Sequence, residues 1–156
     1  MNEFRRAVLK RAGASGALAA ACAAGLLRPR DLLAAGWHKD AFDAKSLAEA
    51  LKSLGAASPA ESKDIVIDAP QLAENGAAVL IEVTSNLPNT KSIAVLIEKN
   101  SFPLAAKFDF IEGAAPFVRL NVKMGESSNV RVIAQAGGKF FTAVKEVKVT
   151  IGGCGG

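Results

Sequence analysis

The sequence predicts an all-β domain: an immunoglobulin-like antiparallel β-sandwich of about seven strands, preceded by one short helix and followed by a flexible glycine-rich arm. Three observations support this prediction. Apolar and polar residues alternate along most of residues 64–151. Turn residues separate these runs at intervals of roughly 8 to 12 residues, as in sandwich folds. Half of the 156 residues are apolar, which is enough for the core of one domain. A β-barrel is the alternative architecture.

The helix is expected within residues 43–54. Leu47, Ala48, Leu51 and Leu54 recur at the spacing of one helix face. Gly55 follows them, and a glycine directly after a helical pattern is a stop signal.

The strands are expected wherever the period of the pattern is two. Gly137-Gly138 separates the last two runs and predicts a tight hairpin between them. In the final run Val147, Val149 and Ile151 should share one face of the strand. The expected strands are 64–68, 77–85, 92–99, 118–122, 129–136 and a last run that ends at Ile151.

The part of the chain with the strand pattern also contains six phenylalanines. They are interpreted as residues of the core or of a partner interface, because nothing around them indicates a cofactor-binding cluster. They are Phe102, Phe108, Phe110, Phe117, Phe140 and Phe141.

The first 36 residues have the pattern of a twin-arginine export signal. Arg5 and Arg6 precede a weakly apolar run at 12–27, and small residues before Trp37 offer a cleavage site. An N-terminal membrane anchor is the alternative, but the run is shorter than the roughly 20 residues that span a bilayer. We therefore expect a periplasmic protein with no membrane anchor.

Three segments follow from these patterns. Residues 1–36 are the export signal, which we expect to be removed, residues 37–151 are the helix and β-sandwich domain, and residues 152–156 are the arm. The formal charge of +4 belongs entirely to the signal, because the remaining residues hold thirteen charges of each sign. No nucleic-acid partner is expected, because no basic surface remains without the signal.

The sequence offers no conventional active site. After the signal it has one histidine, His38, and one cysteine, whereas metal sites need several such ligands. Paired carboxylates, Glu98 with Asp109 or Glu112, stay open as a candidate, although a solvated strand face explains them equally well. We predict no catalytic residue, no metal, no cofactor and no enzymatic activity.

The terminal segment carries the most informative residue, Cys154. Gly152, Gly153, Gly155 and Gly156 flank it, and glycine adopts both signs of φ at little cost. Cys22 is lost with the signal, so Cys154 remains as a lone cysteine in an oxidising compartment. Such a thiol is reactive or forms an intermolecular bond, and an incidental cysteine in a functionless tail is the alternative.

Three stretches of the chain are similar to a known family. They are 147–156 with its GGCGG ending, 98–105, and Lys123-Met124 together with 128–131. With the twin-arginine signal, these stretches resemble SoxY, the sulfur-carrier subunit of the periplasmic thiosulfate-oxidising system. The resemblance implies an immunoglobulin-like domain, a heterodimer with a SoxZ-like subunit, and covalent attachment of sulfur intermediates to Cys154 on its glycine arm.

The resemblance also implies the enzymes that act on the carrier. A cytochrome-type enzyme would couple thiosulfate to Cys154 as an S-thiosulfonate, a hydrolase would release sulfate, and a sulfane dehydrogenase would oxidise the remaining sulfur.

Two rival functions remain at this point. A ubiquitin-like sulfur carrier also ends in Gly-Gly, but its C-terminal carboxylate is activated by ATP. ATP is not available to a protein outside the cytoplasm. An exported binding or structural sandwich could instead use Cys154 for an intermolecular disulfide.

Overall fold

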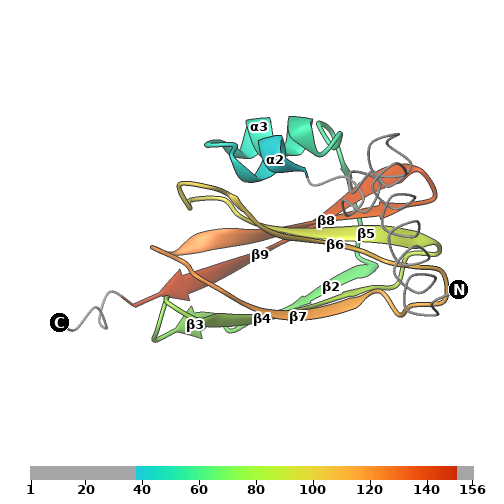
Figure 1. Cartoon of the computed structure of the whole chain (residues 1–156). Helices are drawn as coiled ribbons and strands as arrows, with labels where there is room; N and C mark the ends of the chain where they lie inside the picture. Colours follow the sequence, from blue (N-terminus) through green and yellow to red (C-terminus); the bar gives the residue numbers. More distant parts are fainter. Residues whose placement is uncertain (1–37, 151–156) are drawn as a thin grey trace, which may run out of the picture. The chain divides into compact units, whose positions relative to one another are not determined.

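The computed structural model describes residues 38–150, which form two β-sheets and two short helices (Figure 1). The expectations for residues 1–37 and 151–156 lie outside this part of the chain. The elements in order are α2 (Lys39–Phe42), α3 (Leu47–Ser53), β1 (Ala60–Glu61), β2 (Ile65–Asp68), β3 (Leu72–Ala73), β4 (Val79–Ser85), β5 (Thr90–Ile97), β6 (Leu104–Asp109), β7 (Phe117–Val122), β8 (Ser128–Ala136) and β9 (Lys139–Val149).

The two sheets differ in size. The larger sheet has the order β1-β9-β8-β5-β6, with β3 also paired to β9, and the smaller sheet has the order β2-β4-β7. The long strands pair antiparallel, whereas the two-residue strands β1 and β3 lie parallel to β9. Because β2 lies between them in sequence, the chain crosses from the larger sheet to the smaller and back before β4 begins.

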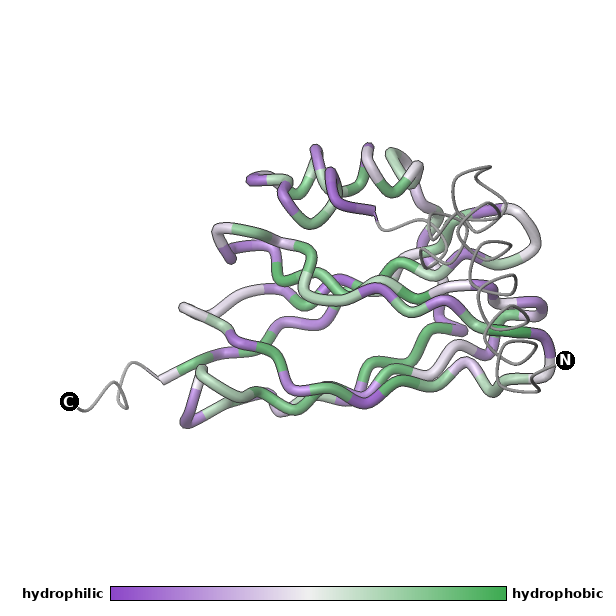
Figure 2. Tube along the Cα trace, in the orientation of Figure 1, coloured by the Kyte–Doolittle hydropathy of each residue, from purple (hydrophilic) through white to green (hydrophobic). Residues whose placement is uncertain are grey.

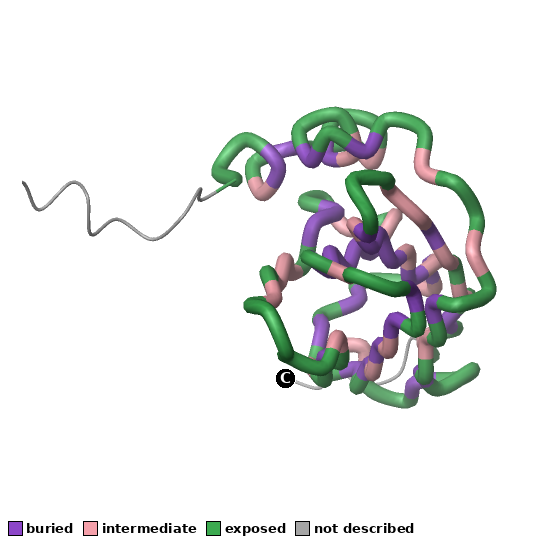
Figure 3. Tube along the Cα trace, turned by 90° about the vertical axis from the view of Figure 1, so that its right-hand side faces the viewer, coloured by how far each residue is buried: buried purple, intermediate pink, exposed green. Residues whose placement is uncertain are grey.

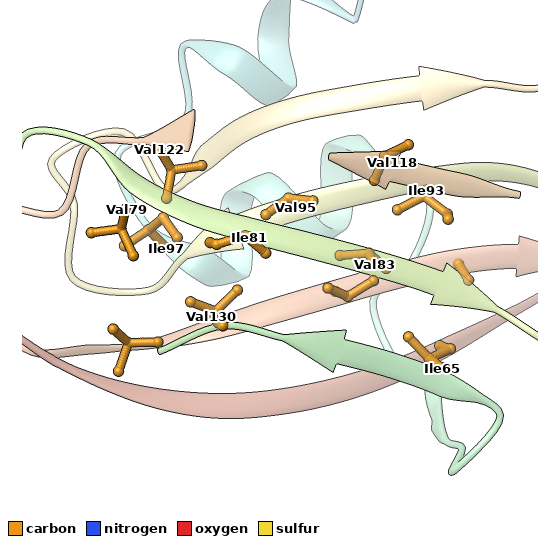
Figure 4. Close-up of a cluster of buried hydrophobic side chains, with 14 of the residues drawn as sticks. Ile65, Val79, Ile81, Val83, Ile93, Val95, Ile97, Val118, Val122 and Val130 are labelled. Atoms are coloured by element: carbon orange, nitrogen blue, oxygen red, sulfur yellow. The ribbon is translucent and has the colours of Figure 1, made fainter. Parts of the chain in front are cut away.

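The main core lies between the two sheets. Alternate residues of β4 are buried, as expected for a strand with one face toward a core. Figure 4 shows side chains of both sheets meeting there, and Figure 2 shows the alternating hydropathy along the strands. The fully buried side chains of this core include Ile81, Val83, Ile93, Val95, Ile97, Val130, Val132 and Val147.

A second apolar cluster joins the helices to the larger sheet. Ala50 and Leu54 pack with Leu96 and Ile133, on the face of that sheet turned away from the main core. Figure 3 shows buried residues on the side of the helical segment that faces the strands. The larger sheet is therefore covered on both faces over part of its area.

The limits of α3 follow from its end residues. The Ser46 hydroxyl accepts a hydrogen bond from the Glu49 amide at 3.3 Å, which satisfies one free donor of the first turn. At the other end, Gly55 has φ of +73° and the Ala56 amide donates to the Leu51 carbonyl at 2.8 Å. This arrangement is a Schellman motif, in which glycine takes the left-handed position.

The predicted hairpin is confirmed. Gly137 and Gly138 join β8 to β9 in a two-residue turn with φ of +55° and +77°. Positive φ at both central positions is typical of a type I′ turn, whose twist matches that of the flanking strands.

The β-sandwich with a short preceding helix is confirmed, but its element count changes. Within residues 38–150 there are nine strands and two helices, where about seven strands and one helix are expected. The residues from Asp43 to Ser46 lie outside α3, because Asp43 caps α2 and Ser46 caps α3. No helix in this part of the chain is long and apolar enough to cross a membrane.

The phenylalanines divide into two groups. Four are partly buried, with Phe108, Phe110 and Phe141 packed against the main core and Phe140 against the helix cluster. Phe102 and Phe117 are 52% and 47% exposed. The core interpretation is therefore confirmed for four residues, and a partner interface stays a prediction for the two exposed ones.

Candidate functional site

The residues with a predicted functional role lie outside the described chain. They are Cys154, Gly152, Gly153, Gly155 and Gly156 of the arm and Arg5 and Arg6 of the signal. The structure describes the residues to which the arm is attached, 148–150, which we call the arm root.

The arm root consists of the last two residues of β9 and the next residue, Thr150. β3 pairs with it in parallel, with the Lys148 amide donating to the Gln71 carbonyl at 3.0 Å. The Thr150 amide donates to the Ala73 carbonyl at 3.1 Å. The last described residue is therefore still hydrogen-bonded to the body of the domain.

On its opposite side the arm root meets a serine. The Ser127 hydroxyl accepts from the Val149 amide at 2.9 Å and lies 3.4 Å from the Val149 carbonyl oxygen, to which it donates. A hydroxyl can make both bonds at once. β8 begins at Ser128, which pairs with Val147, so these bonds lie just beyond the end of the β8–β9 ladder.

A close backbone approach between Gly76 and Met124 lies beside the arm root. The Gly76 carbonyl accepts from the Met124 amide at 2.7 Å. A Cβ placed on Gly76 would collide with the Met124 carbonyl oxygen and would lie 2.9 Å from Val149 Cγ1. Only glycine fits there without a shift of the backbone.

Two loops near the arm root are joined by one amide side chain. Asn100 Nδ2 donates to the Lys123 carbonyl at 2.7 Å, and Asn100 Oδ1 accepts from the Gly125 amide at 3.4 Å. The first loop presents the exposed Phe102, and an exposed ion pair of Lys99 and Glu126 joins the loops at 3.6 Å. The ends of the sandwich strands around the arm root are therefore tied together.

The carboxylates that the sequence leaves open as a candidate site lie toward different ends of the sheet, with Glu112 in the loop that follows Asp109. Glu98 follows the end of β5, whereas Asp109 pairs with Ser92 near the start of that strand. Six residues of an extended strand separate Ser92 from Glu98, a distance of roughly 20 Å. Glu98 instead binds Arg131 and Asn129, so this acid–base candidate is wrong.

Residues 38–150 contain no group of three or more His, Cys, Asp or Glu that could hold a metal. An open pocket lies between the β4–β5 turn and the loop at 110–116, at the hairpin end of the sandwich, and its charged lining residues are Lys91 and Glu112. The register of β8 and β9 puts this end opposite the arm root.

Sequence reasoning missed the residues that hold the arm root. Asn75-Gly76 has the pattern of an ordinary turn, and the close contact of Gly76 depends on segments far away in sequence. Ser127 precedes a strand and has no local pattern that distinguishes it from a loop serine.

The chain has relatives among known proteins. The family model described as "Sulfur oxidation protein SoxY" matches residues 50–154. Among solved structures, the sulfur carrier protein SoxY from Chlorobium limicola f thiosulfatophilum is 39% identical with a TM-score of 0.62, and the match covers 68% of this chain and 97% of that one. No curated protein matches the chain.

A second likeness concerns the fold alone. Superoxide reductase (neelaredoxin) from Ignicoccus hospitalis is 21% identical with a TM-score of 0.50, and the match covers 55% of this chain and 80% of that one. By contrast, the SoxY match extends over two thirds of the chain and includes Cys154. The chain belongs to the SoxY family of sulfur oxidation proteins.

Proposed function

We propose that this protein is a periplasmic sulfur carrier that holds thiosulfate-derived sulfur intermediates on Cys154 and presents them to successive enzymes. The observation that carries the proposal is the extent of the family match, which runs from residue 50 through residue 154 and so reaches the cysteine itself. The similar solved structure is titled a sulfur carrier protein, and the match covers nearly all of that chain. A role as carrier rather than enzyme follows from this proposal.

The chemistry at Cys154 begins with oxidative coupling. A new S–S bond would join the cysteine sulfur to the outer sulfur of thiosulfate, the thiol would lose its proton, and a cytochrome-type enzyme would accept the two electrons one at a time. The thiolate is the reactive form of cysteine, so the enzyme must accept or favour that form. The product is an S-thiosulfonate anion on the carrier.

Two further enzymes complete the cycle. A hydrolase adds water at the sulfonate group, which breaks its bond to the adjacent sulfur, releases sulfate and leaves a persulfide on Cys154. A sulfane dehydrogenase oxidises the outer sulfur of that persulfide, taking oxygen from water and electrons into its own acceptor. A second hydrolysis then returns the free thiol.

The arm explains how one cysteine serves several active sites. Gly152, Gly153, Gly155 and Gly156 carry no side chains, so the segment around the thiol is narrow enough to enter a channel. Tethering also keeps each intermediate at a high effective concentration for the next enzyme. The role of the glycines is therefore to leave the thiol accessible and the backbone adaptable.

The remaining parts of the proposal concern location and assembly. Arg5 and Arg6 direct export by the twin-arginine route, which carries folded proteins. A SoxZ-like subunit forms a heterodimer with the domain, and the exposed Phe102 and Phe117 are candidates for that interface. The carrier works without a cofactor, since the sulfur intermediates are bound directly to Cys154.

The experiment is intact mass spectrometry under non-reducing conditions on protein purified from cells grown with thiosulfate. We expect additions of sulfur or of thiosulfonate that disappear after reduction and are absent from Cys154→Ser. A second sample is alkylated before exposure to thiosulfate and the coupling enzyme, and it should gain no sulfur. A carrier that uses the terminal carboxylate would still be loaded after alkylation.

One outcome would favour the structural alternative. If the only modified form were a disulfide-linked dimer of this chain, Cys154 would act as an intermolecular cross-link. The carrier proposal would then be wrong.

A further inference from the structure

The hydrogen bonds of β9 continue past the end of its partner strand. Ser128 and Val147 are the last residue pair of the β8–β9 ladder. Two residues later, Val149 would lack a backbone partner on that side. Instead, the Ser127 hydroxyl bonds both the amide and the carbonyl of Val149. The Ser127 side chain thus takes the place of the backbone hydrogen bonds that a longer β8 strand would make to Val149.

The other contacts fix the same three residues. Ala73 is buried and pairs with Val149 across the parallel β3 edge, and its carbonyl accepts from the Thr150 amide. The Thr150 hydroxyl lies 3.5 Å from the carbonyl oxygens of Ala73 and Glu74, either of which can accept from it. Val149 packs partly buried against the main core. Side-chain, edge-strand and core contacts therefore converge on the arm root.

We propose that Ser127 and Gly76 are positioning residues that fix the point at which the carrier arm leaves the domain. This inference rests on the proposed carrier function of Cys154. With the root held at Thr150, Cys154 is the fourth residue along the chain after this hydrogen-bonded position. Such a segment reaches about 14 Å at most. We call the contacts of Ser127 and Gly76 at the arm root the clamp. The maximum reach of the thiol therefore depends on the clamp as well as on the length of the terminal segment.

Loss of the clamp would lengthen the arm without any change in its sequence. If the whole arm root, residues 148–150, were released, the next fixed pair would be Ser128 with Val147, seven residues before Cys154. The maximum reach would grow to about 24 Å. Because effective concentration falls roughly as the −3/2 power of tether length, the thiol would be about twofold more dilute at a docked enzyme.

The first test is amide hydrogen exchange at Val149 and Thr150 in the mature protein. Ser127→Ala removes both bonds from the hydroxyl, so exchange at Val149 should accelerate on the order of tenfold. Ser127→Thr keeps a hydroxyl and should restore the wild-type rate. Ser62→Ala is the matched control, because the Ser62 hydroxyl bonds only within the exposed turn that contains Asp64. Unchanged exchange in Ser127→Ala would overturn the clamp.

A pair of glycine variants tests the clamp by a second route. Gly76→Ala must displace Met124 or Val149, whereas a Cβ on Gly125 would meet nothing within 4 Å. Faster exchange at Val149 in Gly76→Ala but not in Gly125→Ala supports the clamp. Equal behaviour of the two variants counts against it, and the serine variants decide the matter if Gly76→Ala does not fold.

The second test measures loading of Cys154 by the thiosulfate-coupling enzyme. Ser127→Ala should raise KM by up to about twofold with little change in kcat, because the tethered thiol is diluted rather than altered. Alkylation of Cys154 by a small reagent should keep its wild-type rate. Normal loading in a variant with faster exchange would overturn the positioning role. If wild-type protein carried no sulfur on Cys154, the proposed function itself would fail, independently of the exchange result.

Discussion

Arg131 and Glu98 form an ion pair on the outer face of the larger sheet, with the guanidinium Nη2 atom 2.7 Å from Oε1 of the carboxylate. The pair links β8 to the end of β5, and Asn129 donates a further bond to the same carboxylate at 3.0 Å. The two side chains are only 24% and 19% exposed. Glu98 is therefore part of the structural network near the arm root rather than a catalytic acid.

We predict that Arg131→Ala lowers the free energy of unfolding by about 1–3 kcal/mol, because Glu98 is left partly buried without its charge partner. Arg119→Ala is the control, since Arg119 is 63% exposed and its bond to Glu82 is 3.2 Å long. Exposed pairs contribute about 0–1 kcal/mol. Urea denaturation of both variants checks the difference. Equal midpoints would contradict the assigned role of the pair.

The β8–β9 turn makes a second prediction about stability. Gly138→Ala should cost about 1 kcal/mol, because alanine is strained at φ of +77°. Gly137→Asn should cost much less, since Asn-Gly is a preferred type I′ sequence. Thermal unfolding of the two variants tests this order. A Gly137→Asn protein that is less stable than Gly138→Ala would argue against the type I′ turn.

The sandwich was predictable because its long strands are half-buried and alternate in hydropathy, as in β4 and β8. The Gly-Gly hairpin was predictable because its turn chemistry is local. β1 and β3 were not predictable, because a strand of two residues is too short to show an alternating pattern of hydropathy. Both strands pair with β9 only in the tertiary structure. β6 was missed because Ala105, Ala106 and Lys107 lack the β-branched character of the other strands.

The candidate site shows the same division. Cys154 and its glycines stand out in the sequence by composition alone. Ser127 and Gly76 do not, because their importance comes from contacts with Val149, which is far from Gly76 in sequence. The pairing of Glu98 with Arg131 was equally inaccessible, since it spans 33 residues and depends on the register of β5 with β8.

The proposed export signal gives a third prediction. Changing Arg5 and Arg6 together to Lys should block periplasmic accumulation of the folded precursor, because the twin-arginine route requires the arginine pair. Changing Arg28 and Arg30 to Lys alters the same segment with the same charge and should leave export intact. Immunoblots of periplasmic and cytoplasmic fractions provide the measurement. Normal export of the Arg5 and Arg6 variant would show that the segment is a different kind of address.

A fourth prediction concerns the arm glycines. Replacing Gly153 and Gly155 with Val should slow enzyme-driven loading of Cys154 severely, because a β-branched residue widens the arm and restricts its backbone. The corresponding Ala pair should fall between wild type and the Val pair, since alanine adds little bulk but loses much of the φ > 0 range.

Alkylation of Cys154 by a small reagent is the reference for this comparison, and we expect similar rates for all three proteins. Loading that simply followed the alkylation rate would contradict a steric role for the glycines. So would normal loading of the Val pair.

The central claim is that Cys154 carries the sulfur, and Cys154→Ser in the complete thiosulfate-oxidising system tests it most directly. We predict that thiosulfate-dependent sulfate release is abolished while the melting temperature stays within about one degree of wild type, because residue 154 lies five residues past β9, the last strand of residues 38–150. Sulfate release at the wild-type rate by this variant would contradict the account.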